Sequence, residues 1–337
     1  EPTAMLAKVE AATLCGTDVH RWHGRVASTE QLPFIPGHET CGTIAEMNGE
    51  RRDLLGEPLK PGDRVLWSYP TCGHCYWCTV AKQTSHCPEI RVWGGSRADQ
   101  FPFLLGGLAD YQYVPPGCDV IKVPASVSSA SAAAAACAYR TVMHGFERLG
   151  AIAPHETVVV QGSGPLGLFA SVVARDRGAY RVLVIGAPDN RLQVARELGA
   201  DDVLSLDEVK DSAGRVKWVQ DRSGGRGADI VIQCATHMAV PEGIAMVRKG
   251  GRYLSVGVGG DASISPTDFW RSVTIIPVTM AEPRHWLQAV RFLESRGAAI
   301  PFDSMISRSY KLEQATEAMN AMANFEVVKP VIYPNGR

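Results

Sequence analysis

The sequence predicts an α/β protein with two domains, one β-rich and one built on a doubly wound parallel sheet. Three observations predict this class. A chain of 337 residues is long enough for two separate cores. The first third is rich in Gly and Pro and has short alternating apolar runs, which are typical of antiparallel strands joined by turns. From about Val142 onward, apolar runs alternate with helical patterns, as in βαβ units.

The elements are expected in the following order. Short alternating runs predict strands at residues 43–47, 64–67 and 111–114. After a helical pattern at 142–149, strands at 157–161, 182–185, 229–232 and 253–256 alternate with helical patterns, one ending at Arg177 and one at 191–198. The tail mixes helix and strand at 286–295, 312–322 and 330–333.

Composition narrows the class of protein. With 45% hydrophobic residues, 20% charged residues and a net charge of −1, the chain has the composition of an ordinary globular protein. It has no basic run that would bind nucleic acid or an anionic membrane surface. The longest apolar stretch, residues 130–137, is far shorter than the ~20 residues that a membrane span needs. No secretion signal is visible, so we expect a cytoplasmic location.

A glycine-rich motif, GSGPLG, follows an expected strand and opens a helix. Gly162 makes the tight turn, Gly164 lets the backbone approach a pyrophosphate, and Gly167 lets the helix pack closely on the strand. Pro165 and Leu166 begin the helix, whose N-terminal N–H groups attract phosphate. A bare motif of this kind is often a surface turn, but the flanking strand and helix favour a dinucleotide site.

The end of the next strand discriminates between NAD and NADP. An acidic residue is expected there, because it binds the ribose 2′-hydroxyl of NAD. Gly186 stands in that place and could leave room for a 2′-phosphate, but no Arg or Lys follows at once and Asp189 would repel a phosphate. Asp189 can also be interpreted as a helix cap. The balance favours NAD, with NADP as the alternative, and we also assign Arg191 and Val256 to this site.

Nine cysteines are the most unusual feature of the composition. Four of them lie in one short loop: Cys72, Cys75, Cys78 and Cys87. Disulfides at this spacing would be strained and nothing indicates secretion, so we expect metal binding. Four thiolates around one tetrahedral zinc ion leave no place for water, so such a site is closed and structural. His86 lies beside Cys87 and is an alternative fourth ligand.

A second set of metal-ligand residues is scattered along the chain: Cys15, His38 and Cys137. Each has an ordinary interpretation, because buried free Cys is common as a small apolar residue and an isolated His is more often structural than a ligand. Their spacing alone does not show that they converge.

Taken together, the motifs resemble the zinc-containing medium-chain dehydrogenase/reductase superfamily, of the alcohol, sorbitol and threonine dehydrogenase type. The resemblance covers essentially the whole chain. It includes residues 15–18 (CGTD), 37–39 (GHE), the four-cysteine loop, 107–111 (GLADY), Cys137 with Thr141, the glycine-rich motif, 198–201 (LGAD), 250–252 (GGR) and 329–332 (KPVI). So many motifs in the same order are highly specific. The family has opening strands ahead of the point where this chain begins, and we expect those to be missing from the sequence.

The resemblance implies a GroES-like β-rich catalytic domain at residues 1–138 and 282–337 and a Rossmann domain at 139–281. It implies that Cys15, His38 and Cys137 bind a catalytic zinc ion, with water or a substrate oxygen in the fourth place. With the four-cysteine site, this makes two zinc ions per chain. One residue more than usual precedes Cys87, which is why His86 remains an alternative.

The resemblance also implies roles for neighbouring residues. Glu39 lies behind the metal, and Asp18 orients the ligand His38. The remaining assignments are a proton relay through Thr17 and His20, a nicotinamide contact by Thr141, and a position near a pyrophosphate contact for Lys329.

The implied activity is hydride transfer between an alcohol and NAD(P), carried out by a homodimer or homotetramer. Aromatic residues near the expected site would suit a secondary or bulky alcohol, although core packing explains them equally well; they are Trp22, Trp67, Tyr69 and Trp93. An NADP-dependent carbonyl reductase is the alternative within this class.

Three other classes of protein compete with this interpretation. A zinc-free quinone or enoyl reductase of the same superfamily would lack both ligand sets. A zinc-ribbon module that binds nucleic acid or protein is opposed by the near-neutral charge and by the complete dinucleotide unit. A cofactor-binding protein without activity is opposed by the presence of every expected catalytic residue.

Overall fold

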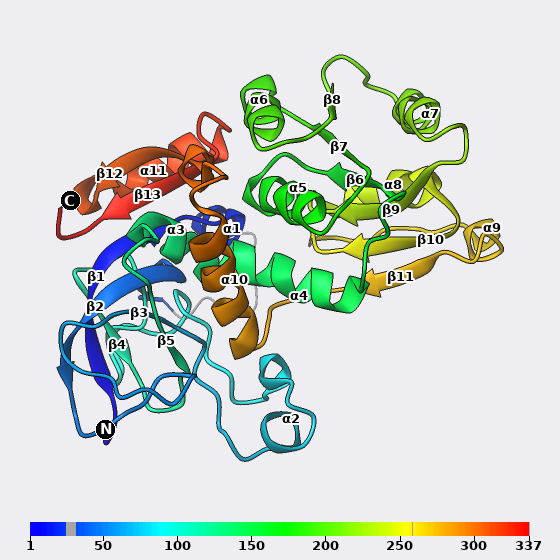
Figure 1. Ribbon diagram of the computed structural model, residues 1–337. Helices are drawn as coiled ribbons and strands as arrows, with labels where there is room; N and C mark the ends of the chain where they lie inside the picture. The colour runs from blue at the N-terminus through cyan, green and yellow to red at the C-terminus, as the bar shows by residue number, and fades with distance from the viewer. Residues whose placement is uncertain (25–31, 258, 337) are drawn as a thin grey trace. The chain divides into compact units, whose positions relative to one another are not determined.

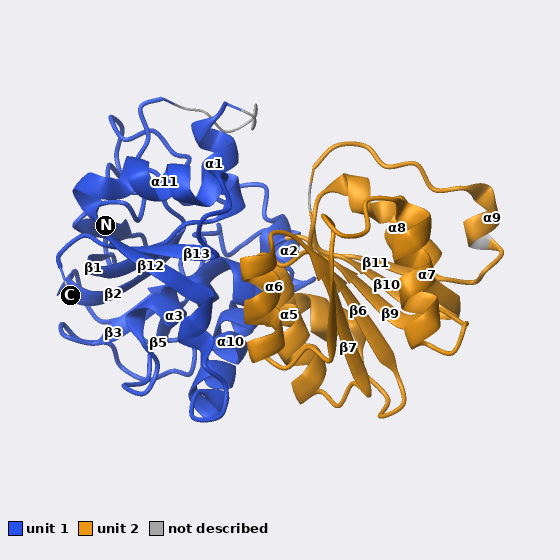
Figure 2. Ribbon diagram, turned by 90° about the horizontal axis from the view of Figure 1, so that it is seen from above, with its two compact units in different colours: residues 1–140, 280–337 blue, residues 141–279 orange. Residues whose placement is uncertain are grey.

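The computed structural model describes residues 1–24, 32–257 and 259–336. The chain divides into two compact units (Figure 2). Unit 1 comprises Glu1–Arg140 and Met280–Arg337, and unit 2 comprises Thr141–Thr279. The domain boundaries expected from the sequence lay between residues 138 and 139 and between residues 281 and 282.

Unit 1 is built on a mixed β-sheet. Its strands are β1 (Met5–Thr13), β2 (Glu39–Met47), β3 (Arg64–Trp67), β4 (Tyr111–Val114), β5 (Val120–Lys122), β12 (Ile306–Lys311) and β13 (Lys329–Tyr333). The sheet has seven strands in the order β12-β13-β1-β2-β3-β5, with β4 also paired to β1 (Figure 1). The strands expected at residues 43–47, 64–67, 111–114 and 330–333 are confirmed.

Unit 1 also contains nine helical segments within its described residues. They are α1 (Gly16–Trp22), α2 (Tyr76–Thr79), η1 (Thr84–His86), α3 (Ser129–Ala134), η2 (Ala135–Tyr139), α10 (Pro283–Arg296), η4 (Phe302–Met305), η5 (Leu312–Gln314) and α11 (Ala315–Ala323). The apolar stretch expected at residues 130–137 therefore forms α3 and then η2, a π-helical segment. Such local widening of a helix is common at functional sites.

The register of β1 brings distant parts of unit 1 to one edge of the sheet. Thr13 pairs with Glu39 at the start of β2 and with Val331 near the start of β13. Because β1 is antiparallel to both strands, the residues that follow it lie beside the residues that open β2 and β13. This edge is where the candidate site forms.

Unit 2 is built on a parallel sheet. Its strands are β6 (Thr157–Gln161), β7 (Arg181–Gly186), β8 (Asp202–Ser205), β9 (Ala228–Gln233), β10 (Val247–Ser255) and β11 (Thr274–Pro277). Its helical segments are α4 (Arg140–Leu149), α5 (Pro165–Asp176), α6 (Asp189–Glu197), α7 (Ser212–Arg222), η3 (His237–Ala239), α8 (Val240–Met246) and α9 (Pro266–Phe269). The six strands run in the order β11-β10-β9-β6-β7-β8. This is the strand order of a doubly wound dinucleotide fold, so the expected Rossmann domain is confirmed.

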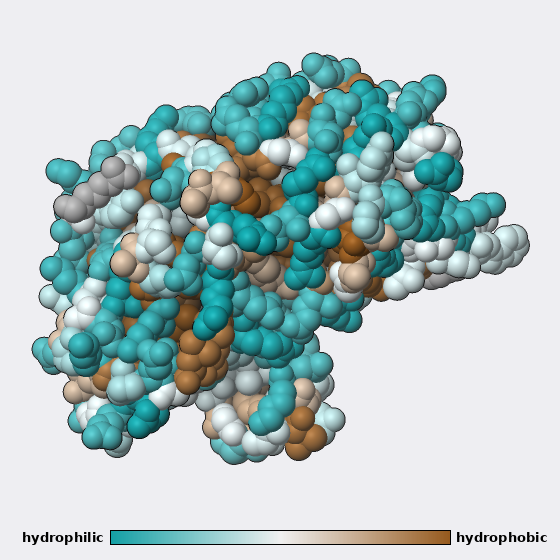
Figure 3. All heavy atoms as spheres, in the orientation of Figure 1, coloured by the Kyte–Doolittle hydropathy of each residue, from teal (hydrophilic) through white to brown (hydrophobic). Residues whose placement is uncertain are grey.

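Some elements had no clear signal in the sequence. The short strand β11 was not expected, although its sequence TIIP contains two isoleucines; only one of them, Ile276, is buried. Within the described residues, every helix is too short or too polar to cross a membrane. In the view of Figure 3 the surface is mainly hydrophilic, with hydrophobic residues exposed in separate places.

Candidate active site and metal centres

Three scattered side chains and one carboxylate meet in unit 1. The ligand atoms of Cys15, His38, Glu39 and Cys137 all lie within 4.8 Å of one another. Cys15 follows β1, and His38 and Glu39 stand at the start of β2, so the register described above brings them together. Cys137 comes from η2. The structure therefore gathers all three residues to which the resemblance assigned a catalytic metal.

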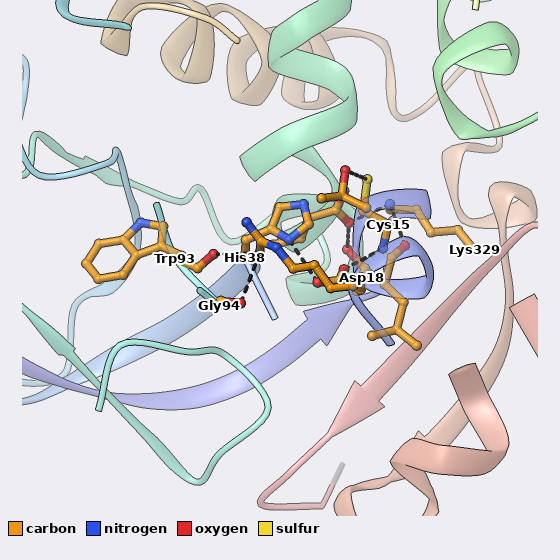
Figure 4. A network of polar contacts seen from close by, with 11 residues as sticks. Cys15, Asp18, His38, Trp93, Gly94 and Lys329 are labelled. Atoms are coloured by element: carbon orange, nitrogen blue, oxygen red, sulfur yellow. Dashed lines mark hydrogen bonds and ion pairs between the residues drawn. The ribbon is translucent and has the colours of Figure 1, made fainter. Parts of the chain in front are cut away.

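Asp18 organises this cluster. One carboxylate oxygen of Asp18 lies 3.0 Å from Nδ1 of His38, and the other accepts a hydrogen bond of 2.8 Å from the backbone N–H of Cys15. Asp18 and His38 are buried. Because Nδ1 is occupied, Nε2 of His38 is the nitrogen left for a metal. Figure 4 shows these side chains pointing toward one another, with Lys329 beside them.

The position of Lys329 differs from the expected pyrophosphate contact. Its side chain is only 1% exposed, and its Nζ lies 2.5 Å from Oε2 of Glu39 and donates to the carbonyl of Leu14 at 3.1 Å. Thr13 donates to the same oxygen of Glu39. Burial acts to lower the pKa of Lys329, but Glu39, Cys15 and Cys137 together outweigh it and the pKa is raised. The ammonium therefore pairs with Glu39 within unit 1 and is not free to contact phosphate.

The donor set suits a zinc ion. Zinc prefers thiolates and imidazole, and a catalytic zinc ion keeps three protein ligands and one open position. A hydrogen bond from Cys137 lowers the pKa of Cys15 well below its ordinary value, and His38 adds to this effect. The second oxygen of Glu39, Oε1, is buried without a hydrogen-bond partner in the described part of the chain. A buried acceptor left unpaired beside two sulfurs is what a bound cation would satisfy.

The residues expected to relay a proton lie on α1. The hydroxyl oxygen of Thr17 lies 3.8 Å from the sulfur of Cys15, so Thr17 borders the cluster. His20 is exposed one turn further along the helix. Residues three apart lie on the same face of a helix, so Thr17 and His20 share one side of α1.

The four-cysteine loop forms a second cluster in unit 1. The sulfurs of Cys72, Cys75, Cys78 and Cys87 lie within 4.8 Å of one another, and three pairs are 3.5 to 4.0 Å apart. Disulfide bonds need about 2.05 Å, whereas tetrahedral zinc with bonds of about 2.3 Å spaces its sulfurs at about 3.8 Å. The His74 backbone lowers the pKa of Cys72 to about 6, which favours the thiolate.

The structure also decides between Cys87 and His86 as the fourth donor. The sulfur of Cys87 lies with the other three sulfurs, whereas the ring of His86 packs against Trp77 with the ring centres 5.1 Å apart. His86 is not part of the cluster.

The glycine-rich motif of unit 2 joins β6 to α5 as expected. Gly162 has a φ of +106°, and a Cβ on Gly167 would lie 1.8 Å from the carbonyl oxygen of Gly162, so neither position accepts a side chain without strain. Gly164 caps α5, and Pro165 and Leu166 open the helix. The N–H groups at this helix start are available to an anion.

Three other residues assigned to the coenzyme lie at or near the same edge of the parallel sheet. Val256 directly follows β10, and Gly186 ends β7. Arg191 is on the first turn of α6 and is buried. Thr141 begins unit 2 on α4. Asp189 is not the cap of α6, because Pro188 occupies that position and the Asp189 carboxylate accepts a hydrogen bond from Ser205 at 2.8 Å.

The absence of a side chain at Gly186 has a packing cause. A Cβ there would lie 2.4 Å from Oγ, 2.7 Å from Cβ and 2.8 Å from the backbone nitrogen of Ser163. The glycine-rich loop therefore leaves no room for a side chain at Gly186. Gly186 allows β7 and this loop to approach closely, so it does not by itself indicate NADP.

This packing gives a testable contrast between two glycines. Gly186→Ala should destabilise the protein by about 1–3 kcal/mol, because the new methyl group overlaps Ser163. Gly164→Ala should leave the melting temperature nearly unchanged, because a Cβ there meets no atom within 4 Å, but it should weaken coenzyme binding at the phosphates. Thermal melting and coenzyme titration of both variants measure this. Equal melting temperatures would contradict the packing explanation.

Three residues that organise unit 1 were not expected from the sequence. Arg21 on α1 donates to the carbonyls of Trp93 and Gly94 at 3.3 and 2.9 Å (Figure 4). Glu282 accepts hydrogen bonds from Thr84 and Ser85 beside the cysteine loop. The sequence around Arg21 and around Glu282 gave only a weak indication of these roles.

Arg140 is the third. It is buried, and its presence in an otherwise apolar segment was a usable signal.

These features define a class of protein. A Rossmann domain with a glycine-rich phosphate loop, in a chain whose β domain gathers two thiols and an imidazole, is typical of a nicotinamide-dependent dehydrogenase. Comparison with known proteins identifies the family. The profile of the alcohol dehydrogenase GroES-like domain matches residues 1–125, and that of the zinc-binding dehydrogenase domain matches residues 165–295.

Relatives match along nearly the whole chain. The 5-exo-hydroxycamphor dehydrogenase of Pseudomonas putida is 33% identical over 98% of this chain and 92% of its own length. The erythritol/L-threitol dehydrogenase of Mycolicibacterium smegmatis is 29% identical, over 99% and 91%. An alcohol dehydrogenase structure from Thermotoga maritima superimposes with a TM-score of 0.92 at 34% identity, covering 99% of this chain and 93% of that one.

The chain belongs to the zinc-containing medium-chain dehydrogenase/reductase family of alcohol dehydrogenases. It is accordingly an oxidoreductase that acts on a CH–OH group with a nicotinamide coenzyme. The resemblance stated from the sequence is confirmed.

Proposed function

We propose that this protein is a zinc-dependent, NAD-linked dehydrogenase that interconverts a secondary alcohol on a compact apolar skeleton with its ketone. The observation that carries the proposal is the meeting of Cys15, His38 and Cys137 in one partly buried cluster. The names of two relatives, a hydroxycamphor dehydrogenase and an erythritol/threitol dehydrogenase, support an alcohol substrate of modest size. Buried aromatic side chains in unit 1, among them Trp67 and Trp93, support the apolar part.

We assign the catalytic zinc ion to Cys15, His38 and Cys137 and a structural zinc ion to the four-cysteine loop. A catalytic zinc ion, when bound, supplies a Lewis acid that favours the ionised form of an alcohol hydroxyl. The protein holds the donors in place. Asp18 fixes the ring of His38, and Lys329 neutralises the carboxylate of Glu39.

The proton released by the alcohol would leave through α1. The Thr17 hydroxyl, which borders the cluster, can accept and pass on a proton. His20 is exposed on the same face of the helix and would hand the proton to solvent, because histidine exchanges protons near neutral pH. Thr141 would pack against the nicotinamide.

The coenzyme is proposed to be NAD. The carboxylate of Asp189, just beyond the end of β7, disfavours a 2′-phosphate, and the glycine at position 186 is explained by its packing against Ser163. A related structure from Sinorhizobium meliloti, 28% identical with a TM-score of 0.85 over 99% of this chain and 92% of that one, contains NADP. An NADP-dependent carbonyl reductase therefore remains the second candidate.

We also propose a homodimer or homotetramer. The edge strand β11 of unit 2 exposes Ile275, and Trp270 just before it is exposed as well. An exposed sheet edge with apolar side chains is suited to pairing with another chain.

Initial rates with NAD and NADP over a panel of alcohols test the proposed function. We expect oxidation of cyclic secondary alcohols with a preference for NAD, two zinc ions per chain, and loss of activity on chelation that added zinc restores. A clear preference for NADP in the reductive direction would favour the second candidate. No turnover of any alcohol or ketone with either coenzyme, in protein that retains its zinc, would refute the proposal.

A further inference from the structure

Arg140 is a buried cation that lacks a carboxylate partner. Its side chain is 2% exposed, and its Nε donates to the carbonyl of Ala136 at 2.5 Å. Its Nη1 is buried without a hydrogen-bond partner among the described residues. The guanidinium instead lies over two aromatic rings, with Cζ 5.0 Å from the ring centre of Tyr69 and 4.0 Å from that of Trp286.

The two aromatic rings stabilise the positive charge of Arg140 but do not accept hydrogen bonds from its N–H groups in the plane of the guanidinium. A guanidinium carries five N–H groups in one plane, and stacking on ring faces leaves those N–H groups unused. Burying an unpaired donor or charge is costly unless something binds to it. The two rings hold the guanidinium in place, and Nη1 remains without an acceptor among the described residues.

The guanidinium lies close to the catalytic cluster. Its bond to Ala136, the neighbour of Cys137, places it one helical turn back from its own backbone. Tyr69 links the two groups: burial raises its pKa, while Arg140 and His38 both act to lower it, so its hydroxyl is within electrostatic reach of both.

The carboxylates around the cluster already have partners within the protein. Asp18 pairs with His38, and Glu39 pairs with Lys329. Neither carboxylate is therefore the acceptor that Arg140 lacks, and Nη1 has no other acceptor among the described residues.

We propose that Arg140 is a specificity-determining residue that donates from Nη1 to a second oxygen of the substrate, remote from the reacting hydroxyl. The proposal rests on the proposed function and narrows it. The substrate is a secondary alcohol that also carries a carbonyl or carboxylate oxygen on its apolar frame. Both groups accept hydrogen bonds from a guanidinium, the carboxylate more strongly.

Three matched alcohols test this: cyclohexanol, hydroxycyclohexanone and hydroxycyclohexanecarboxylate. Wild-type protein should prefer one or both oxygenated alcohols, and the preferred one identifies the acceptor. Arg140→Met should lower kcat/KM for that alcohol roughly 10- to 100-fold, the effect of losing a charged hydrogen bond, and change cyclohexanol much less. Arg140→Lys should keep an intermediate preference, because it retains the charge without the planar geometry.

Two further measurements separate recognition from packing. The inhibition constant of cyclohexanecarboxylate, which has neither a reacting hydroxyl nor a ketone, should rise in Arg140→Met if the acceptor is a carboxylate and stay unchanged if the acceptor is a carbonyl. Arg64→Met is the matched control, because Arg64 lies in the same unit with its donors on the backbone carbonyls of Pro124 and Val127. Arg64→Met should leave the ratio of kcat/KM for the preferred oxygenated alcohol to kcat/KM for cyclohexanol unchanged.

The proposal is overturned if Arg140→Met lowers kcat/KM for all three alcohols by the same factor, since that is the effect of a packing role. It is also overturned if wild-type protein oxidises cyclohexanol and shows no preference for either oxygenated alcohol. Should Arg140→Met fail to fold, the ratio measured in Arg140→Lys decides in the same way. Failure of wild-type protein on every alcohol is a different result, which refutes the proposed function itself and this inference with it.

Discussion

Cys15→Ser should abolish turnover and remove one of the two expected zinc ions while leaving the fold intact. A serine hydroxyl does not ionise at neutral pH, so the cluster would lose one of its two thiolate donors. The Lewis acid contributes several kcal/mol to such a reaction, which corresponds to a loss of kcat on the order of 10³-fold or more. Steady-state rates, zinc content and thermal melting of the same preparation measure the three effects.

The control for Cys15→Ser is a cysteine outside both clusters. Cys118 is buried in unit 1, and burial raises the pKa of its thiol, so it stays protonated. Cys118→Ala should keep two zinc ions and most of the activity, with a modest loss of stability from the smaller side chain. Full activity in Cys15→Ser, or equal loss of activity in both variants, would contradict the assigned role of Cys15.

The elements of this fold follow from local patterns in the sequence. The strand β6, the glycine-rich loop and α5 were expected almost residue for residue, because apolar period, loop glycines and helix start all lie within one short segment. By contrast, no strand was expected at β1, β5, β8, β11 or β12. The edge strand β11 is an example. Its side chains are mostly exposed, and its place at the sheet edge is determined by pairing with β10, which no local pattern records.

The candidate active site could not be derived from spacing, because sheet register creates it. Thr13 must pair with Glu39 and Val331 before Cys15, His38 and Lys329 become neighbours. These pairings span most of the chain, so only the resemblance to a known family identified the ligands in advance.

The residues that sequence reasoning misjudged share a physical cause. Lys329 was expected at a phosphate, but a buried Glu39 beside it binds its charge more closely than solvent-exposed phosphate could. Gly186 was a possible indication of room for a 2′-phosphate, whereas its close packing against Ser163 explains the absence of a side chain there. In both cases a contact between segments distant in sequence determines what the side chain does.

Loss of the four-cysteine site should have the largest effect on stability. The loop has little core of its own, since Tyr76, Trp77 and Val80 are exposed, and its only regular structure is the short segments α2 and η1. Structural zinc contributes about 10–16 kcal/mol of binding free energy in small zinc domains. Cys78→Ser should therefore unfold the loop, lower the melting temperature and expose residues 72–87 to protease.

Unfolding of the cysteine loop should also destabilise the start of α10. Glu282 is buried and accepts hydrogen bonds from Thr84 and Ser85, so an unfolded loop leaves its carboxylate without those donors. Limited proteolysis, zinc content and melting of Cys78→Ser, compared with Cys15→Ser, separate the two sites. Cys78→Ser should mainly lower the melting temperature, whereas Cys15→Ser should mainly lower the rate of turnover. If Cys78→Ser keeps two zinc ions and the wild-type melting temperature, the loop does not bind a structural metal.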